Sequence, residues 1–194
     1  MGSYLDIRQT TVRLAAPLTP DDYQAQSLPE GSPVKWHLAH TTWFFETFVL
    51  RDHVAGYRAH DESWAYLFNS YYEAEGERHA RPRRGMLSRP SLDEVRNYRA
   101  AVDEVLLTAL PDLPEQALAL VELGLHHEQQ HQELMLMDIQ ATFAENPLKP
   151  ALWPAPAPAP APLASGLGWA EGGHSAGRSG FSAKVAWMSI SISS

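Results

Sequence analysis

The stretch HHEQQHQE, residues 126–133, lies inside a long run of helical character, roughly Pro114 to Glu145. Within it, His127 and His131 are four residues apart. On a helix this spacing places both imidazoles on one face, one turn apart, close enough to share a metal ion. Helical steps along this face lead to Leu120, Leu123, Gly124, Leu134 and Asp138. The pair is therefore expected to point into a core, where a shared metal ion is the strongest reason for two imidazoles.

The composition of the 194-residue chain narrows the kind of site. It has no cysteine, so a metal must be held by His, Asp or Glu, which favours Fe, Zn, Mn or Ni. The net charge of −8 disfavours a nucleic-acid partner, because phosphate binding needs clustered Lys and Arg. No apolar run reaches the ~20 residues that span a bilayer. The N-terminus lacks the form of a signal peptide, so we expect a cytoplasmic protein with no membrane partner.

Residues 1–147 predict several helices and no convincing strand. Ser32 is the expected N-cap of the second helix, and Ser91 with Glu94 forms a capping box at the start of a later one. The expected helices are Tyr4–Ala16, Pro33 to about Asp52, a short one in Ser63–Ala74, Ser91 to about Leu110, and Pro114–Glu145. This pattern is typical of an all-α four-helix bundle with moderately long connections.

A second histidine pair, in WHLAH at residues 36–40, offers a third ligand. Facing helices of a bundle project side chains into a shared interior, so His37 or His40 could join the first pair. The spacing does not say which of the two does so. Three histidines would leave open positions on a metal for substrate and, if the metal is Fe(II), for O₂.

HEQQH, residues 127–131, also matches the H-E-x-x-H signature of zinc proteases. Such a protease needs a third ligand further along the chain. The candidates there are Glu133, Asp138 and Glu145, none well placed, and no strand is predicted that would hold an extended peptide. The three-histidine interpretation is therefore preferred.

Three longer strings resemble a known family. They are SPVKWHLAHTTWFFETFVL (32–50), YLFNSYYEAEGERHARPRRGMLSRPS (66–91) and LHHEQQHQELMLMDIQ (125–140). In this order they are similar to the N-terminal DinB-like domain of the ergothioneine-biosynthesis sulfoxide synthases (EgtB), over most of residues 10–150. The resemblance implies a DinB-type four-helix bundle. It also implies a non-haem Fe(II), O₂-dependent enzyme that joins the sulfur of cysteine or γ-glutamylcysteine to C2 of hercynine.

The resemblance also implies roles for single residues. The metal ligands of the family fall on His40, His127 and His131. Gln130 matches a position that contacts hercynine in some members. In the arginine-rich loop, Arg83 and Arg84 would offer guanidinium groups to a substrate carboxylate.

The sequence predicts three segments. Residues 1–150 form the metal-binding bundle, 151–165 a Pro/Ala linker containing PAPAPAPAP, and 166–194 a tail expected to be disordered. GLGWAEGG, residues 166–173, resembles the beginning of the family's second domain, related to formylglycine-generating enzymes, and the likeness then ends. The chain is therefore expected to lack most of that domain. Two alternatives stay open, a non-catalytic metal-binding stub and a DinB-type metal-dependent thiol transferase.

Overall fold

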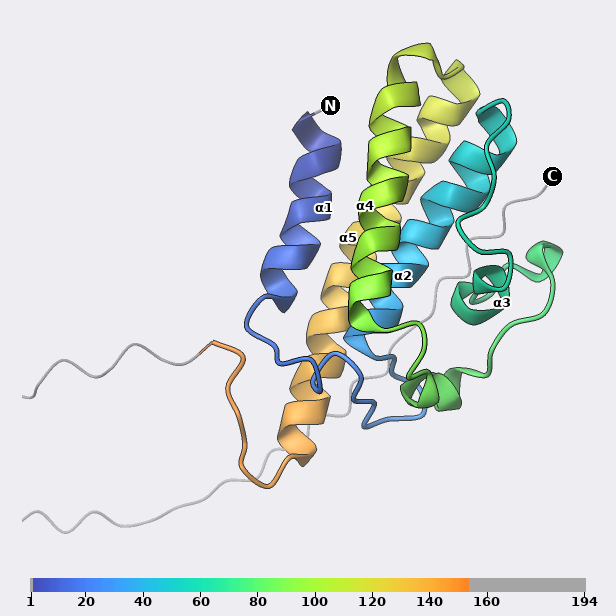
Figure 1. The fold of residues 1–194 in the computed structure, drawn as a ribbon. Helices are drawn as coiled ribbons and strands as arrows, with labels where there is room; N and C mark the ends of the chain where they lie inside the picture. Colours follow the sequence, from blue (N-terminus) through green and yellow to red (C-terminus); the bar gives the residue numbers. More distant parts are fainter. Residues whose placement is uncertain (1, 154–194) are drawn as a thin grey trace, which may run out of the picture. The chain divides into compact units, whose positions relative to one another are not determined.

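A computed structural model describes residues 2–153, and Figure 1 shows its long helices lying side by side. These are α1 (Gly2–Ala15), α2 (Val34–Phe45), α4 (Leu92–Ala109) and α5 (Glu115–Glu145). No β-strand occurs among the described residues. The all-α bundle expected from the sequence is confirmed for this part of the chain. The expectations for the linker beyond residue 153 and for the tail lie outside the described residues.

The long helices do not all run in the same direction (Figure 1). The helices α2 and α4 run the same way, and α5 runs opposite to both. Two parallel neighbours need a connection as long as the bundle, which is the role of residues 52–91. This crossover contains α3 (Trp64–Phe68) and two 3₁₀ segments, η2 (Glu73–Glu75) and η3 (Arg81–Met86). A π-helical turn, η1 (Glu46–Arg51), extends α2, and a 3₁₀ turn, η4 (Leu110–Asp112), follows α4.

None of the helices in residues 2–153 combines the length and the apolar character that crossing a membrane requires.

Of the two expected helix caps, the one at Ser91 is confirmed and the one at Ser32 is wrong. The capping box is confirmed, since the Ser91 hydroxyl accepts from the Glu94 amide and the Glu94 carboxylate accepts from the Ser91 amide. The N-cap expected at Ser32 is wrong, because the helix begins at Val34 and has no side-chain cap. The backbone N–H of Ser32 instead donates to the Asp138 carboxylate at 2.9 Å. The Ser32 hydroxyl, which would have to cap the helix, instead accepts from Arg84 at 2.9 Å.

The short aromatic helix is also shorter than expected. It ends at Phe68, because the side chain of Asn69 folds the following backbone into a turn. The Asn69 amide donates to the Tyr72 carbonyl at 3.1 Å, and its side-chain oxygen accepts from the Tyr72 N–H at 3.3 Å. Asn side chains compete with helical hydrogen bonds in this way.

The helix α2 lies at the centre of the bundle. All its residues are buried, and it packs against α3, α4 and α5. A helix that buries residues on every face is stable only when other elements surround it. Its largest side chains, Trp36 and Trp43, are 2% and 1% exposed. The histidines of α2 are therefore held in a closely packed environment.

Gly124 sets the approach of α5 to α2. A Cβ atom at this position would lie 2.9 Å from Cζ of Phe45 and 3.0 Å from Cε1 of Phe44, and closer still to Cε1 of Phe45. A larger residue here would force the rings or the two helices to shift. His127 is about one turn beyond Gly124, and His40 is about one turn before Phe44, so this close contact brings the two histidines together.

The buried face of α5 is rotated from the face expected from the sequence. Leu120, Leu123, Leu134 and Asp138 are only partly buried. The helix packs against both α1 and α2, so its buried face lies between these two neighbours. The buried residues are Ala117, Val121, Gly124, Glu128, His131, Met135 and Ile139.

Candidate metal centre

The histidines of α2 and α5 meet in one cluster. One ring nitrogen from each of His40, His127 and His131 lies within 4.8 Å of the others. The ring centroids are 4.9 Å apart for His40 and His127, 4.7 Å for His40 and His131, and 4.6 Å for His127 and His131. These three residues are a group that could hold a metal ion.

The ring of His40 is oriented by the crossover and by two indoles. Its Nδ1 lies 2.6 Å from the carbonyl oxygen of Phe68. A carbonyl only accepts, so Nδ1 carries the proton and Nε2 keeps its lone pair. Trp36 and Trp43 lie nearly parallel to the imidazole, with centroids 4.4 and 5.7 Å away. His40 is thus held through Nδ1, and its Nε2 is available to a metal.

His131 is held by the other histidine of the WHLAH motif. Its Nδ1 lies 2.8 Å from Nδ1 of His37, and Nε2 of His37 lies 3.0 Å from the carboxylate of Asp138. The contact with His37 leaves Nε2 of His131 for a metal. The structure therefore places His40 in the cluster and His37 behind it, a distinction that spacing alone left open.

His127 is partly exposed, and it packs against Phe44 with ring centroids 4.8 Å apart. Its Nδ1 is buried and makes no hydrogen bond to any described residue. A buried polar atom without a partner is costly, and a metal ion is one way to satisfy it. The donor set of the cluster therefore fits a metal ion.

The protonation of the three rings also suits metal binding. Burial lowers the pKa of His127 to about 4, and it holds the pKa values of His40 and His131 well below the usual range. The imidazoles are therefore neutral at pH 7, which leaves lone pairs for coordination. Neutral imidazoles suit Fe, Zn, Ni and Cu, and the cluster contains no carboxylate.

Glu128 does not face the histidine cluster. Its carboxylate is fully buried and accepts hydrogen bonds from Arg8 at 2.8 Å, from Thr11 at 2.6 Å and from Arg99. Burial alone raises its pKa, but Arg8 and Arg99 outweigh this and hold the pKa at about 2. A protease glutamate would have to activate a metal-bound water, whereas this one joins α5 to α1 and α4. HEQQH therefore matches the protease signature in sequence only, without a glutamate at the metal centre.

A family model described as the DinB superfamily matches residues 4–135, more than half of the chain. The chain belongs to the DinB superfamily. Domains of this superfamily bind metal ions, in agreement with the three-histidine cluster between α2 and α5. A search of curated proteins found no match.

The other site residues expected from the sequence have different positions in the DinB bundle. Gln130 is exposed on α5, about one turn beyond His127. Arg83 is exposed on η3. Arg84 is buried over the ring of Trp36, with Cζ 3.4 Å from its centroid, and donates to Ser32 and Ser70. The structure thus brings Arg84 next to the indole that stacks on His40, while Gln130 and Arg83 lie on the surface.

Three residues of the DinB domain had no assigned role in the sequence. Spacing alone did not separate His37 from His40, Asp138 was considered only as a residue of the inward face and as a protease ligand, and Glu128 only as the glutamate of H-E-x-x-H. No local signal pairs Glu128 with Arg8 and Arg99, which are 120 and 29 residues away. No local signal pairs His37 with Asp138, which are 101 residues apart.

Proposed function

We propose that this DinB domain is the iron-binding part of a non-haem Fe(II), O₂-dependent sulfoxide synthase of ergothioneine biosynthesis. Its substrates would be hercynine and cysteine or γ-glutamylcysteine. The observation that carries the proposal is the cluster of three neutral imidazoles, two from HEQQH and one from WHLAH. The resemblance of the three long sequence strings supports the choice of substrates and of Fe(II).

The proposed reaction balances with O₂ as the oxidant. The S–H of the thiol and the C2–H of hercynine are replaced by a C–S bond, and the two hydrogens leave in water. One oxygen atom of O₂ becomes the sulfoxide oxygen and the other becomes that water. When bound, Fe(II) would supply the oxidising chemistry of this reaction.

The residues of the chain would hold the reactants. His40, His127 and His131 would hold the metal as neutral donors and leave other positions open. The exposed amide of Gln130, next to His127 on the helix surface, would hydrogen-bond hercynine. Arg83 and Arg84 would attract a substrate carboxylate, and burial against Trp36 makes Arg84 the more rigid of the two.

The test uses the full chain, prepared without oxygen and loaded with Fe(II). We expect O₂ uptake and a sulfoxide product when hercynine is added with either thiol. His127→Ala should abolish metal binding and product, because it removes one ligand of three. The matched control is His126→Ala, an exposed neighbour on the same helix, which should behave like the unchanged chain.

The other outcomes contradict the proposal in separate ways. Fe(II) binding without O₂ uptake or product would indicate a non-catalytic metal-binding domain. Zn(II) binding with thiol transfer and no O₂ requirement would indicate a thiol transferase. Full metal affinity in His127→Ala would show that the three-histidine centre itself is wrong.

A further inference from the structure

His37 and Asp138 lie outside the histidine cluster and are connected to it, one after the other, through His131. His131 contacts His37 through their Nδ1 atoms at 2.8 Å, and His37 contacts Asp138 through Nε2 at 3.0 Å. His37 and His131 are 2% and 8% exposed, and the Asp138 side chain is 22% exposed. These contacts connect a partly exposed carboxylate to the buried histidine cluster.

The direction of these hydrogen bonds follows from the chemistry of the groups. A carboxylate oxygen only accepts, so Nε2 of His37 carries a proton. A metal-bound Nε2 of His131 carries none, so the proton of its neutral ring is on Nδ1. His131 therefore donates to His37, and His37 donates to Asp138. In this arrangement the lone pair of His131 is on the nitrogen that a metal needs.

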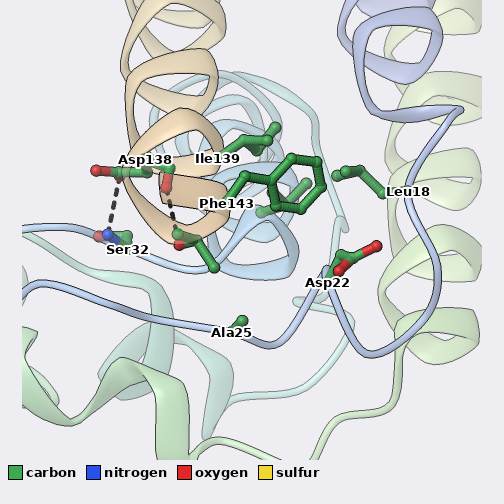
Figure 2. Close-up of a pocket in the computed structure, with 9 residues that line it drawn as sticks. Leu18, Asp22, Ala25, Ser32, Asp138, Ile139 and Phe143 are labelled. Atoms are coloured by element: carbon green, nitrogen blue, oxygen red, sulfur yellow. Dashed lines mark hydrogen bonds between the residues drawn. The ribbon is translucent and has the colours of Figure 1, made fainter. Parts of the chain in front are cut away.

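The carboxylate of Asp138 is held in place by the loop before α2. The backbone N–H of Ser32 donates to Oδ2 of Asp138 at 2.9 Å, as Figure 2 shows. At Gly31 a Cβ atom would lie only 2.8 Å from Oδ1 and 3.3 Å from Cγ of the same carboxylate. The loop before α2 thus closes on Asp138 because residue 31 has no side chain.

We propose that His37 and Asp138 are positioning residues of the metal centre, forming a relay, Asp138–His37–His131, that fixes the tautomer and ring orientation of His131. The relay rests on the proposed function only in requiring a metal at the three histidines. Carboxylate partners of ligating histidines raise their basicity and hold their orientation. Here the Asp138 carboxylate does not contact His131 directly. His37 is hydrogen-bonded to both and couples the carboxylate to the ligand.

The first test measures the affinity of the full chain for Zn(II) and Co(II). Asp138→Asn keeps the size of the side chain but removes its charge, and we expect binding about 10–100-fold weaker. The matched control is Asp103→Asn. Asp103 is similarly exposed, at 20%, and accepts hydrogen bonds from Tyr4 and Arg8 away from the cluster. Equal affinity in Asp138→Asn and the control would overturn the relay.

The second test varies the middle of the relay. His37→Leu leaves Nδ1 of His131 without an acceptor and should weaken metal binding. His37→Gln can both accept from His131 and donate to Asp138, so it should recover part of the lost affinity. Urea unfolding of each variant separates a loss of affinity from a loss of fold. If the Gln and Leu variants bind metal as tightly as the unchanged chain, the relay is wrong.

The third test needs no substitution. Nitrogen NMR of the histidine rings in the metal-free chain should show His131 protonated at Nδ1 and His37 protonated at Nε2. The opposite tautomer at His131 would overturn the relay even if a variant failed to fold. If the unchanged chain binds no divalent metal, the proposed function fails. If it binds metal but shows the wrong tautomer, the relay alone fails.

Discussion

Glu128 is a fully buried carboxylate, and both of its oxygens accept hydrogen bonds. Oε2 accepts from Arg8, and Oε1 accepts from Thr11 and Arg99. The two guanidinium groups come from different helices, and Glu128 is the negative charge that they share, while Asp103 also pairs with Arg8 at 2.7 Å. Removing one partner of such a group leaves the others buried and uncompensated.

Glu128→Gln should therefore lower the free energy of unfolding by about 3–5 kcal/mol. The amide keeps the shape of the side chain but cannot neutralise Arg8 and Arg99. The measurement is urea unfolding of the metal-free chain. The control is Glu122→Gln on the exposed side of α5, where a surface substitution costs at most about 0.5 kcal/mol. Similar stability of the two variants would contradict a structural role for Glu128.

At the scale of the helices, the contact between α2 and α5 decides whether the metal ligands meet. Gly124 lies inside α5, where glycine costs about 1 kcal/mol relative to alanine. The rings of Phe44 and Phe45 occupy the space where a Cβ atom would be. The close approach of the two helices is thus the reason for a glycine that local helix propensity disfavours.

Gly124→Ala should destabilise the bundle despite the better helix propensity. Overpacking a core costs up to about 3 kcal/mol, and the close ring atoms of Phe44 and Phe45 place this change above the propensity gain of about 1 kcal/mol. Thermal unfolding of the metal-free chain measures the difference. Combining the change with Phe45→Leu removes the nearest ring, so the double variant should lose less stability than the sum of the two single changes. Strict additivity, or a stabilised Gly124→Ala, would contradict the close contact.

At the scale of the whole molecule, the bundle buries several ionisable groups whose protonation opposes folding. Burial lowers the pKa of His127 to about 4 and the pKa values of His37, His40 and His131 as well. An unfolded histidine has a pKa near 6.5, so the unfolded chain takes up protons first as the pH falls. Stability is therefore complete above pH 6.5 and decreases below it.

The metal-free chain should lose stability steadily between pH 7 and pH 4. Below about pH 4.5 the loss should steepen, because Glu128, whose pKa is held at about 2, contributes stability only while its carboxylate is ionised. Urea unfolding at a series of pH values measures this dependence. His127→Gln, which cannot titrate, should show a shallower slope between pH 6.5 and pH 4. A flat profile over this range would contradict the buried, neutral histidines.

Much of the fold could be predicted from the sequence because its signals are local. The apolar periodicity, the capping box at Ser91 and the prolines before and after α5 each depend on neighbouring residues. The pairing of His127 with His131 is also local, since one helical turn separates them. Local patterns were therefore sufficient for an all-α bundle with a histidine pair on its longest helix.

The remaining features were decided by tertiary structure, because they join residues far apart in the chain. The rotation of the buried face of α5 depends on α1 and α2 packing on either side of it. The separation of roles between His40 and His37 depends on which partners each ring contacts, Phe68 in one case and His131 with Asp138 in the other. Residue types and spacing determined what could bind a metal, whereas the packing of distant helices decided which nitrogen of each ring is left to do so.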